Sequence, residues 1–73
     1  MPGRMRRLDA SEVETLLGRH GFVLVSQKGS HRKWRNDAVQ LQVIVPVHRG
    51  RPLPLGTLRA ILAGARIPPE EWR

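Results

Sequence analysis

The 73-residue sequence contains no cysteine and no tyrosine, and its only aromatic side chains are two tryptophans and one phenylalanine. Without cysteine, disulfides, thiolate nucleophiles and zinc sites built on Cys ligands are excluded. Long apolar runs are also missing, because the longest, Val43–Val47, is far too short to cross a bilayer. A short chain without disulfides fits a reducing compartment, so we expect a cytoplasmic protein without a membrane partner.

Acidic residues are scarce as well, with six Asp and Glu against 13 Lys and Arg, which leaves a net charge of +7. Such a small basic protein is expected to bind nucleic acid, an acidic protein or an anionic membrane. Membrane binding would favour a basic amphipathic helix. Here the basic residues gather in Met1–Arg7 and in a predicted strand, which favours nucleic acid. The length predicts a single domain over residues 1–73, with any active site shallow.

The first structured segment, residues 8–21, has the periodicity of an amphipathic helix. Asp9 is the predicted N-cap, and Glu12 three residues later completes a capping box. Ser11 is the competing cap. A glycine after the helix is a natural stop, and His20 just before it fits the negative end of the helix dipole better than a chemical role.

After this helix the hydrophobic period changes from about 3.6 to about 2, which indicates β-strands. We expect strands at residues 22–25, 31–35 and 39–47, a tight turn at 28–30, a second helix beginning near Pro54 or Thr57, and a terminal helical turn at 67–72. The order α-β-β-β-α predicts an α+β fold. Its three-stranded antiparallel sheet would carry both helices on one face.

Alternation along the second predicted strand gives it two unlike faces. His31, Lys33 and Arg35 share one face, whereas Arg32 and Trp34 share the other. We expect the Trp34 ring to pack with the valines of the third strand. This arrangement leaves a basic sheet face open to solvent or to a ligand.

His31 is the candidate catalytic residue, because imidazole titrates near neutral pH and can act as a general base. The neighbouring polar and cationic side chains could bind phosphate groups; they are Lys28, Ser30, Arg32, Lys33 and Arg35. From composition alone, a solvated or phosphate-binding face without catalysis is the more common explanation of such a strand. No two histidines have the i, i+4 spacing of a helical metal site, so we expect neither metal nor cofactor.

Four motifs then follow one another in a recognisable order. They are His-Gly-Phe-Val-Leu-Val at 20–25, Gln-Lys-Gly-Ser-His-Arg at 27–32, Val-Ile-Val-Pro-Val-His at 43–48 and Pro-Leu-Gly-Thr-Leu-Arg-Ala-Ile-Leu at 54–62. Together they resemble the HicA toxin family, small toxins of bacterial and archaeal toxin–antitoxin pairs. The resemblance extends over about residues 8–67.

This resemblance implies a fold similar to the double-stranded RNA-binding domain and the activity of an mRNA interferase. It implies that the catalytic histidine is the one in Gly-Ser-His, here His31, and that a HicB antitoxin binds the toxin and covers this site. Our mechanistic hypothesis is metal-independent attack by a ribose 2′-OH that His31 deprotonates. His48 is the candidate general acid.

The sequence departs from the family pattern at two places. Met1–Arg7 has no counterpart, and is either a disordered basic arm or the product of a misassigned start codon. Arg66 stands where the family often has glycine after the second helix. Because a left-handed conformation strains arginine, we expect the helix cap to shift towards Gly64.

Two other classes of function remain open from the sequence. One is a non-catalytic RNA-binding module that uses the same basic sheet face. The other is an interaction protein that acts only in complex with an acidic partner. Recognition of bases by an aromatic platform is not expected, because only Phe22, Trp34 and Trp72 could stack on bases.

Overall fold

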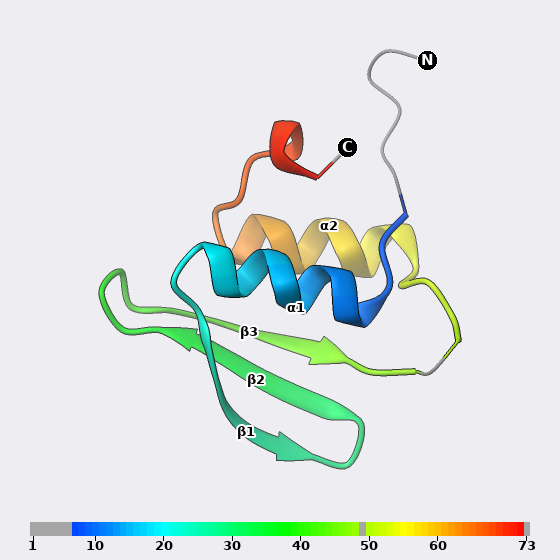
Figure 1. Cartoon of the computed structure of the whole chain (residues 1–73), viewed down its shortest axis with the longest axis horizontal. Coiled ribbons are helices and arrows are strands. Elements are labelled where there is room, and N and C mark those ends of the chain that lie inside the picture. The colour runs from blue at the N-terminus through cyan, green and yellow to red at the C-terminus, as the bar shows by residue number, and fades with distance from the viewer. Residues whose placement is uncertain (1–6, 49, 73) are drawn as a thin grey trace.

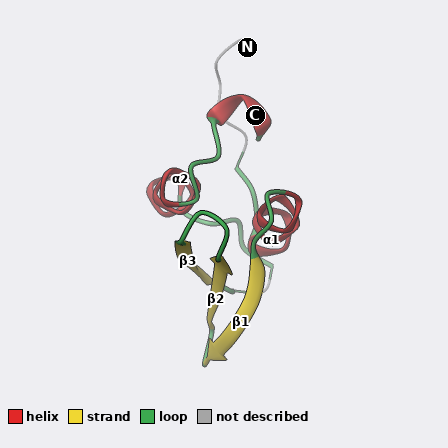
Figure 2. Ribbon diagram, turned by 90° about the vertical axis from the view of Figure 1, so that its left-hand side faces the viewer, coloured by secondary structure: helices red, strands yellow, loops and turns green. Residues whose placement is uncertain are grey.

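The structure is a computed structural model that describes residues 7–48 and 50–72. Its elements are α1 (Ala10–Arg19), β1 (Val23–Lys28), β2 (His31–Asn36), β3 (Leu41–Pro46), α2 (Leu55–Gly64) and the short 3-10 helix η1 (Pro69–Glu71). The three strands form one antiparallel sheet in the order β1-β2-β3. Both helices lie on the same side of this sheet (Figures 1 and 2). The predicted α+β architecture, similar to the double-stranded RNA-binding domain, is therefore confirmed.

Helix α1 begins with the predicted capping box. The Asp9 carboxylate accepts from the Glu12 backbone N–H at 2.8 Å, and the Glu12 carboxylate accepts from the Asp9 N–H at 3.1 Å. Two N–H groups that the helix leaves unpaired are thereby satisfied, so Asp9, and not Ser11, is the cap. At the other end, Gly21 adopts a φ of +88°, which ends the helix as predicted.

Helix α2 ends differently from the prediction. Its left-handed residue is Arg66, with a φ of +57°, and not Gly64. The Arg66 N–H donates to the Ala63 carbonyl at 3.0 Å, and the Ile67 N–H donates to the Leu62 carbonyl at 2.9 Å. These two hydrogen bonds form a Schellman motif. Ile67 is only 3% exposed. These hydrogen bonds and this burial hold Arg66 in a conformation that arginine disfavours, so the predicted shift of the cap is wrong.

Two strands, β1 and β3, differ from the prediction by more than one residue at one end. β1 is longer than the predicted 22–25, because it continues to the turn at Lys28. β3 is shorter than the predicted 39–47 and begins only at Leu41. The preceding Gln40 has a φ of +54°, so the chain there is turning and cannot form an extended ladder. Val39 consequently lies in the turn, 55% exposed, instead of on the core face.

The core lies between the helices and the sheet, and β3 supplies its buried strand residues, Val43 and Val45. Trp34 of β2 packs against it, half-buried, as the alternation predicted. Every residue of β1 is exposed. The helices therefore pack over β3, whereas the side chains of β1 remain exposed to solvent.

The C-terminal turn closes over the helices (Figure 1). Trp72 is 3% exposed and belongs to the core, and the His20 Nε2 lies 2.8 Å from the Glu71 Oε1. His20 is the C-cap of α1, at the helix end where the sequence predicted it. Of the basic segment Met1–Arg7, only Arg7 is among the described residues, and its guanidinium donates to the Leu53 carbonyl at 3.4 Å. The remainder of the predicted arm lies outside them.

Candidate active site

The tip of the β1–β2 hairpin brings a lysine opposite the candidate histidine. Lys28 and His31 are directly paired across the two strands, and only Gly29 and Ser30 separate them in the chain. Gly29 has a φ of +59°, whereas Ser30 has a negative one, the pattern of a type II′ hairpin turn with glycine first. The Gly-Ser pair thus holds the ammonium and the imidazole on the same face of the sheet.

Further cations follow His31 along the same face of β2. Lys33 and Arg35 lie two and four residues on, so their side chains point to the same side as the imidazole. Their cross-strand neighbours on β3 are Ile44 and Gln42, and Pro46 lies opposite His31. Within residues 7–48 and 50–72, the side chains of Lys28, His31 and Lys33 make no hydrogen bond or ion pair, so they are free to meet a ligand.

Two of the other predicted site residues are already engaged. Arg35 is paired with Asp37 just beyond the strand. Ser30 is anchored through its backbone, because its carbonyl accepts from the Val47 N–H at 2.8 Å. This bond ties the hairpin tip to the end of β3, and the Gln27 side-chain amide adds a second tie to the Gly29 carbonyl at 3.0 Å. The turn that presents His31 is therefore braced from both strands.

Arg32 lies on the opposite face from the other cations. Its Nε is 2.7 Å from the Glu14 Oε2 on α1, close enough for an ion pair, although the N–H does not point at that oxygen. The same oxygen accepts the Trp34 Nε1–H at 2.6 Å. Glu14 is thus a junction between the helix and the helix-facing side of β2. Sequence analysis missed it, because no local pattern connects residues twenty positions apart.

His48 lies beyond the end of β3, where the chain leaves the sheet. It lines a small hollow of about 180 Å³ with Asp9, Ala10 and Ser11 at the beginning of α1. Val47, its neighbour, bonds to Ser30, so the chain carries His48 just past the hairpin tip. Within the described residues, His48 and His31 form no hydrogen bond with each other.

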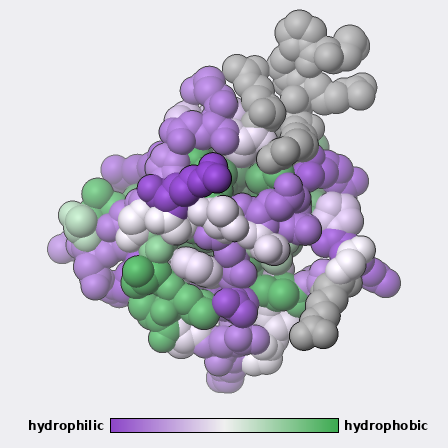
Figure 3. All heavy atoms as spheres, viewed as in Figure 1, coloured by the Kyte–Doolittle hydropathy of each residue, from purple (hydrophilic) through white to green (hydrophobic). Residues whose placement is uncertain are grey.

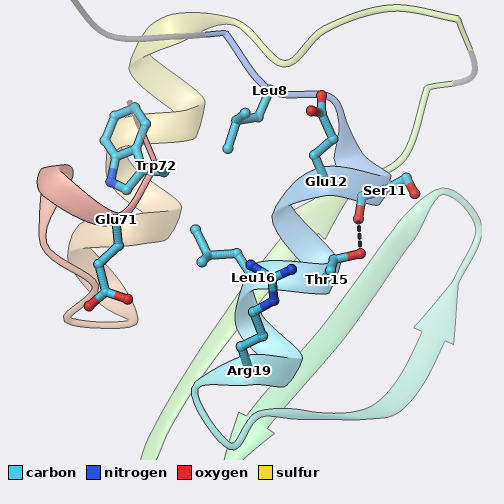
Figure 4. Close-up of a pocket in the computed structure, with 8 residues that line it drawn as sticks. All are labelled: Leu8, Ser11, Glu12, Thr15, Leu16, Arg19, Glu71 and Trp72. Atoms are coloured by element: carbon cyan, nitrogen blue, oxygen red, sulfur yellow. Dashed lines mark hydrogen bonds between the residues drawn. The ribbon is translucent and has the colours of Figure 1, made fainter.

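A larger hollow, of about 250 Å³, lies on the helix side of the molecule between α1 and η1. Figure 4 shows that Leu8, Leu16 and Trp72 form its apolar wall and that the Arg19 side chain reaches up beside Leu16. None of the predicted site residues lines it. The candidate active site is instead an open surface, as expected for so small a core.

In the part of the chain that the structure describes, no group of three or more His, Cys, Asp or Glu side chains is arranged to hold a metal ion. No helix in the same part of the chain is both long and apolar enough to span a membrane.

These features define a small basic α+β protein whose sheet carries a histidine and unpaired lysines on its open face. Comparison with protein families gives the match that this fold and the Gly-Ser-His turn indicate. The model of the HicA toxin of bacterial toxin–antitoxin systems matches residues 10–67. The chain therefore belongs to the HicA toxin family and is the toxin of a toxin–antitoxin system. A search of the curated proteins finds no match.

Proposed function

We propose that this toxin is a metal-independent mRNA interferase that cuts RNA on the open face of its sheet. The observation that carries the proposal is the pairing of Lys28 with His31 across a braced turn. Nucleophilic attack on a phosphodiester is promoted by a general base, which takes the proton of the nucleophile, and by a nearby cation, which stabilises the charge on the phosphate. Because its proposed substrate is mRNA, we expect the toxin to act in the cytoplasm.

In this mechanism His31 accepts the proton of a ribose 2′-OH. The 2′ oxygen then forms a bond to the adjacent phosphorus while the bond from phosphorus to the 5′ oxygen breaks. Lys28 and Lys33 stabilise the charge on the phosphate oxygens. The leaving 5′ oxygen takes a proton from a general acid, for which His48 is our candidate. The products are a 2′,3′-cyclic phosphate and a 5′-OH.

The remaining polar residues of the face are assigned to holding the RNA backbone. Arg35 would exchange its contact with Asp37 for a phosphate, and the Ser30 hydroxyl would donate to another. Arg32 was also a candidate from the sequence. Because its Nε lies against Glu14 on the helix side, we assign it to fixing β2 rather than to the phosphates.

Cleavage of a long RNA in EDTA tests this proposal. The wild type should cut, and His31→Ala should not, while the two bind RNA with similar affinity, because His31 is exposed and its loss leaves the core intact. His48→Gln should slow cleavage without altering the product ends. A 5′-phosphate product or an absolute need for Mg²⁺ would contradict the mechanism. Salt-sensitive RNA binding without cleavage by any variant would favour the non-catalytic RNA-binding module.

We also propose that the HicB antitoxin of this toxin covers the same face. The face is cationic and exposed, so an antitoxin that buries it would remove both the general base and the phosphate contacts from RNA. Inhibition of cleavage by purified HicB, reversed when the antitoxin is degraded, is the expected result.

A further inference from the structure

β1 is an edge strand that the rest of the fold leaves uncovered. It pairs only with β2, and all six of its residues are exposed. Three consecutive apolar residues begin it, Val23, Leu24 and Val25, which are 58%, 40% and 48% exposed. Figure 3 shows hydrophobic side chains gathered over the lower part of the molecule, where the strands lie in Figure 1. An exposed apolar edge with unpaired backbone groups is a template for another strand.

The opposite edge of the sheet lacks this character. β3 packs beneath α2, its core-facing residues Val43 and Val45 are buried, and it ends in Pro46, which cannot donate to a further ladder. β1 contains no proline, and its only charged residue is Lys28 at its end. The one protective feature is a bulge between Leu24 and Ser26, which breaks the register with β2 at Val25.

Charge decides which kind of strand could pair there. Lys28 ends β1, and Lys33 and Arg35 stand on the adjacent strand, facing away from the helices. Two copies of this chain joined along β1 would bring two proteins of net charge +7 together at their basic faces. Such repulsion disfavours a dimer. The edge instead fits a strand whose apolar residues meet Val23 and Val25 and whose acidic residues meet Lys28.

We propose that the antitoxin adds a strand to the free edge of β1 and directs carboxylates from that strand onto Lys28. The inference rests on the proposed HicB partner and specifies how it binds. Neighbouring strands lie about 4.8 Å apart, so a strand beside β1 is within side-chain reach of Lys28, the residue paired with His31. Strand addition therefore anchors the antitoxin next to the active site, and its backbone bonds supply affinity that does not depend on the site's own residues.

The test is the affinity of purified HicB for three variants, measured by calorimetry. Val25→Asp puts a carboxylate into the edge and should weaken binding about tenfold or more, whereas Val25→Thr keeps a β-branched residue and should stay within about threefold. Val39→Asp is the matched control, because Val39 is similarly exposed, at 55% against 48% for Val25, but lies in the β2–β3 turn. It should bind like the wild type. Circular dichroism checks that all three are folded.

Amide hydrogen exchange gives an independent reading of the same contact. Binding of HicB should slow exchange at those β1 amides that do not face β2. Unchanged exchange in β1, or equal affinity of Val25→Asp and the wild type, would overturn strand addition. Dimers of the free toxin that Val25→Asp dissolves would point to a second copy as the occupant instead. Because these readouts are of binding, they remain informative even where RNA cleavage is absent and the proposed nuclease activity fails.

Discussion

Lys28 and His31 face each other across the first turn of the sheet, and the two residues between them determine how they are presented. A two-residue connection gives the hairpin tip little freedom, and the hydrogen bond from Val47 to Ser30 removes part of what remains. The proposed general base and its neighbouring cation are therefore placed by backbone geometry. Side-chain packing contributes little, because both residues are exposed.

Replacing Gly29 with alanine should destabilise the hairpin. A Cβ at this position would touch nothing within 4 Å, so the cost comes from the backbone φ of +59° alone and should be about 1 kcal/mol. For a domain of this size the midpoint of thermal unfolding would fall by about 4–8 °C. Gly56→Ala is the control, because Gly56 also has open space around it but lies in α2 with an ordinary φ. It should be neutral or stabilising.

Arg66→Gly should stabilise the protein by about 1 kcal/mol, since glycine adopts the left-handed conformation without strain. Denaturant unfolding measures the change. Arg66→Ala separates the two possible origins of a gain, because it removes the same positive charge and retains a Cβ. An equal gain in the alanine variant would show that charge repulsion, and not backbone strain, is the cost that arginine carries here.

Glu14→Ala should destabilise the protein by about 1–2 kcal/mol, because the Trp34 indole N–H loses its acceptor in a half-buried position. Glu14→Gln keeps an oxygen for that hydrogen bond and loses only the ion pair with Arg32, so its cost should be smaller. Denaturant unfolding monitored by tryptophan fluorescence compares the two. Glu70→Ala, at an exposed position on η1, is the reference for loss of a surface carboxylate. A glutamine variant as unstable as the alanine variant would contradict the hydrogen-bond explanation.

Lys28→Ala and Lys33→Ala should each weaken RNA binding at low salt and make it less dependent on salt. The slope of log affinity against log salt should fall by about 0.7 for each phosphate of single-stranded RNA that the variant no longer neutralises. Arg19→Ala removes the same charge from the helix side of the molecule and should leave the slope nearly unchanged. Equal effects of all three variants would mean that only the total charge matters.

The parts of the fold that sequence analysis predicted depend on local signals. The capping box at Asp9 and the stop at Gly21 are set by residues within a few positions of each other, so the sequence contains all the information needed. The faces of β2 follow from simple alternation, which placed His31 and Trp34 correctly on opposite sides.

The parts that it missed depend on contacts between residues far apart in the sequence, or on positions where the surrounding structure overrides the conformational preference of the residue. Val39 has strong strand preference, yet Gln40 turns the chain and leaves it exposed. Arg66 is held in the left-handed conformation because the next residue, Ile67, is buried in the core. The shared carboxylate of Glu14 brings α1 and β2 together across twenty residues, and no motif in either segment indicates it.

The single covered face of the sheet has a consequence for how β2 tolerates change. Its even-numbered residues Arg32 and Trp34 face α1, whereas its odd-numbered residues face outward. In a saturation scan scored separately for abundance and for toxicity, the two scores should alternate with a period of two along this strand. Deletion of one residue between His31 and Trp34 would move the residues on one side of the gap to the opposite face of the sheet, so such a deletion should lower abundance and toxicity together.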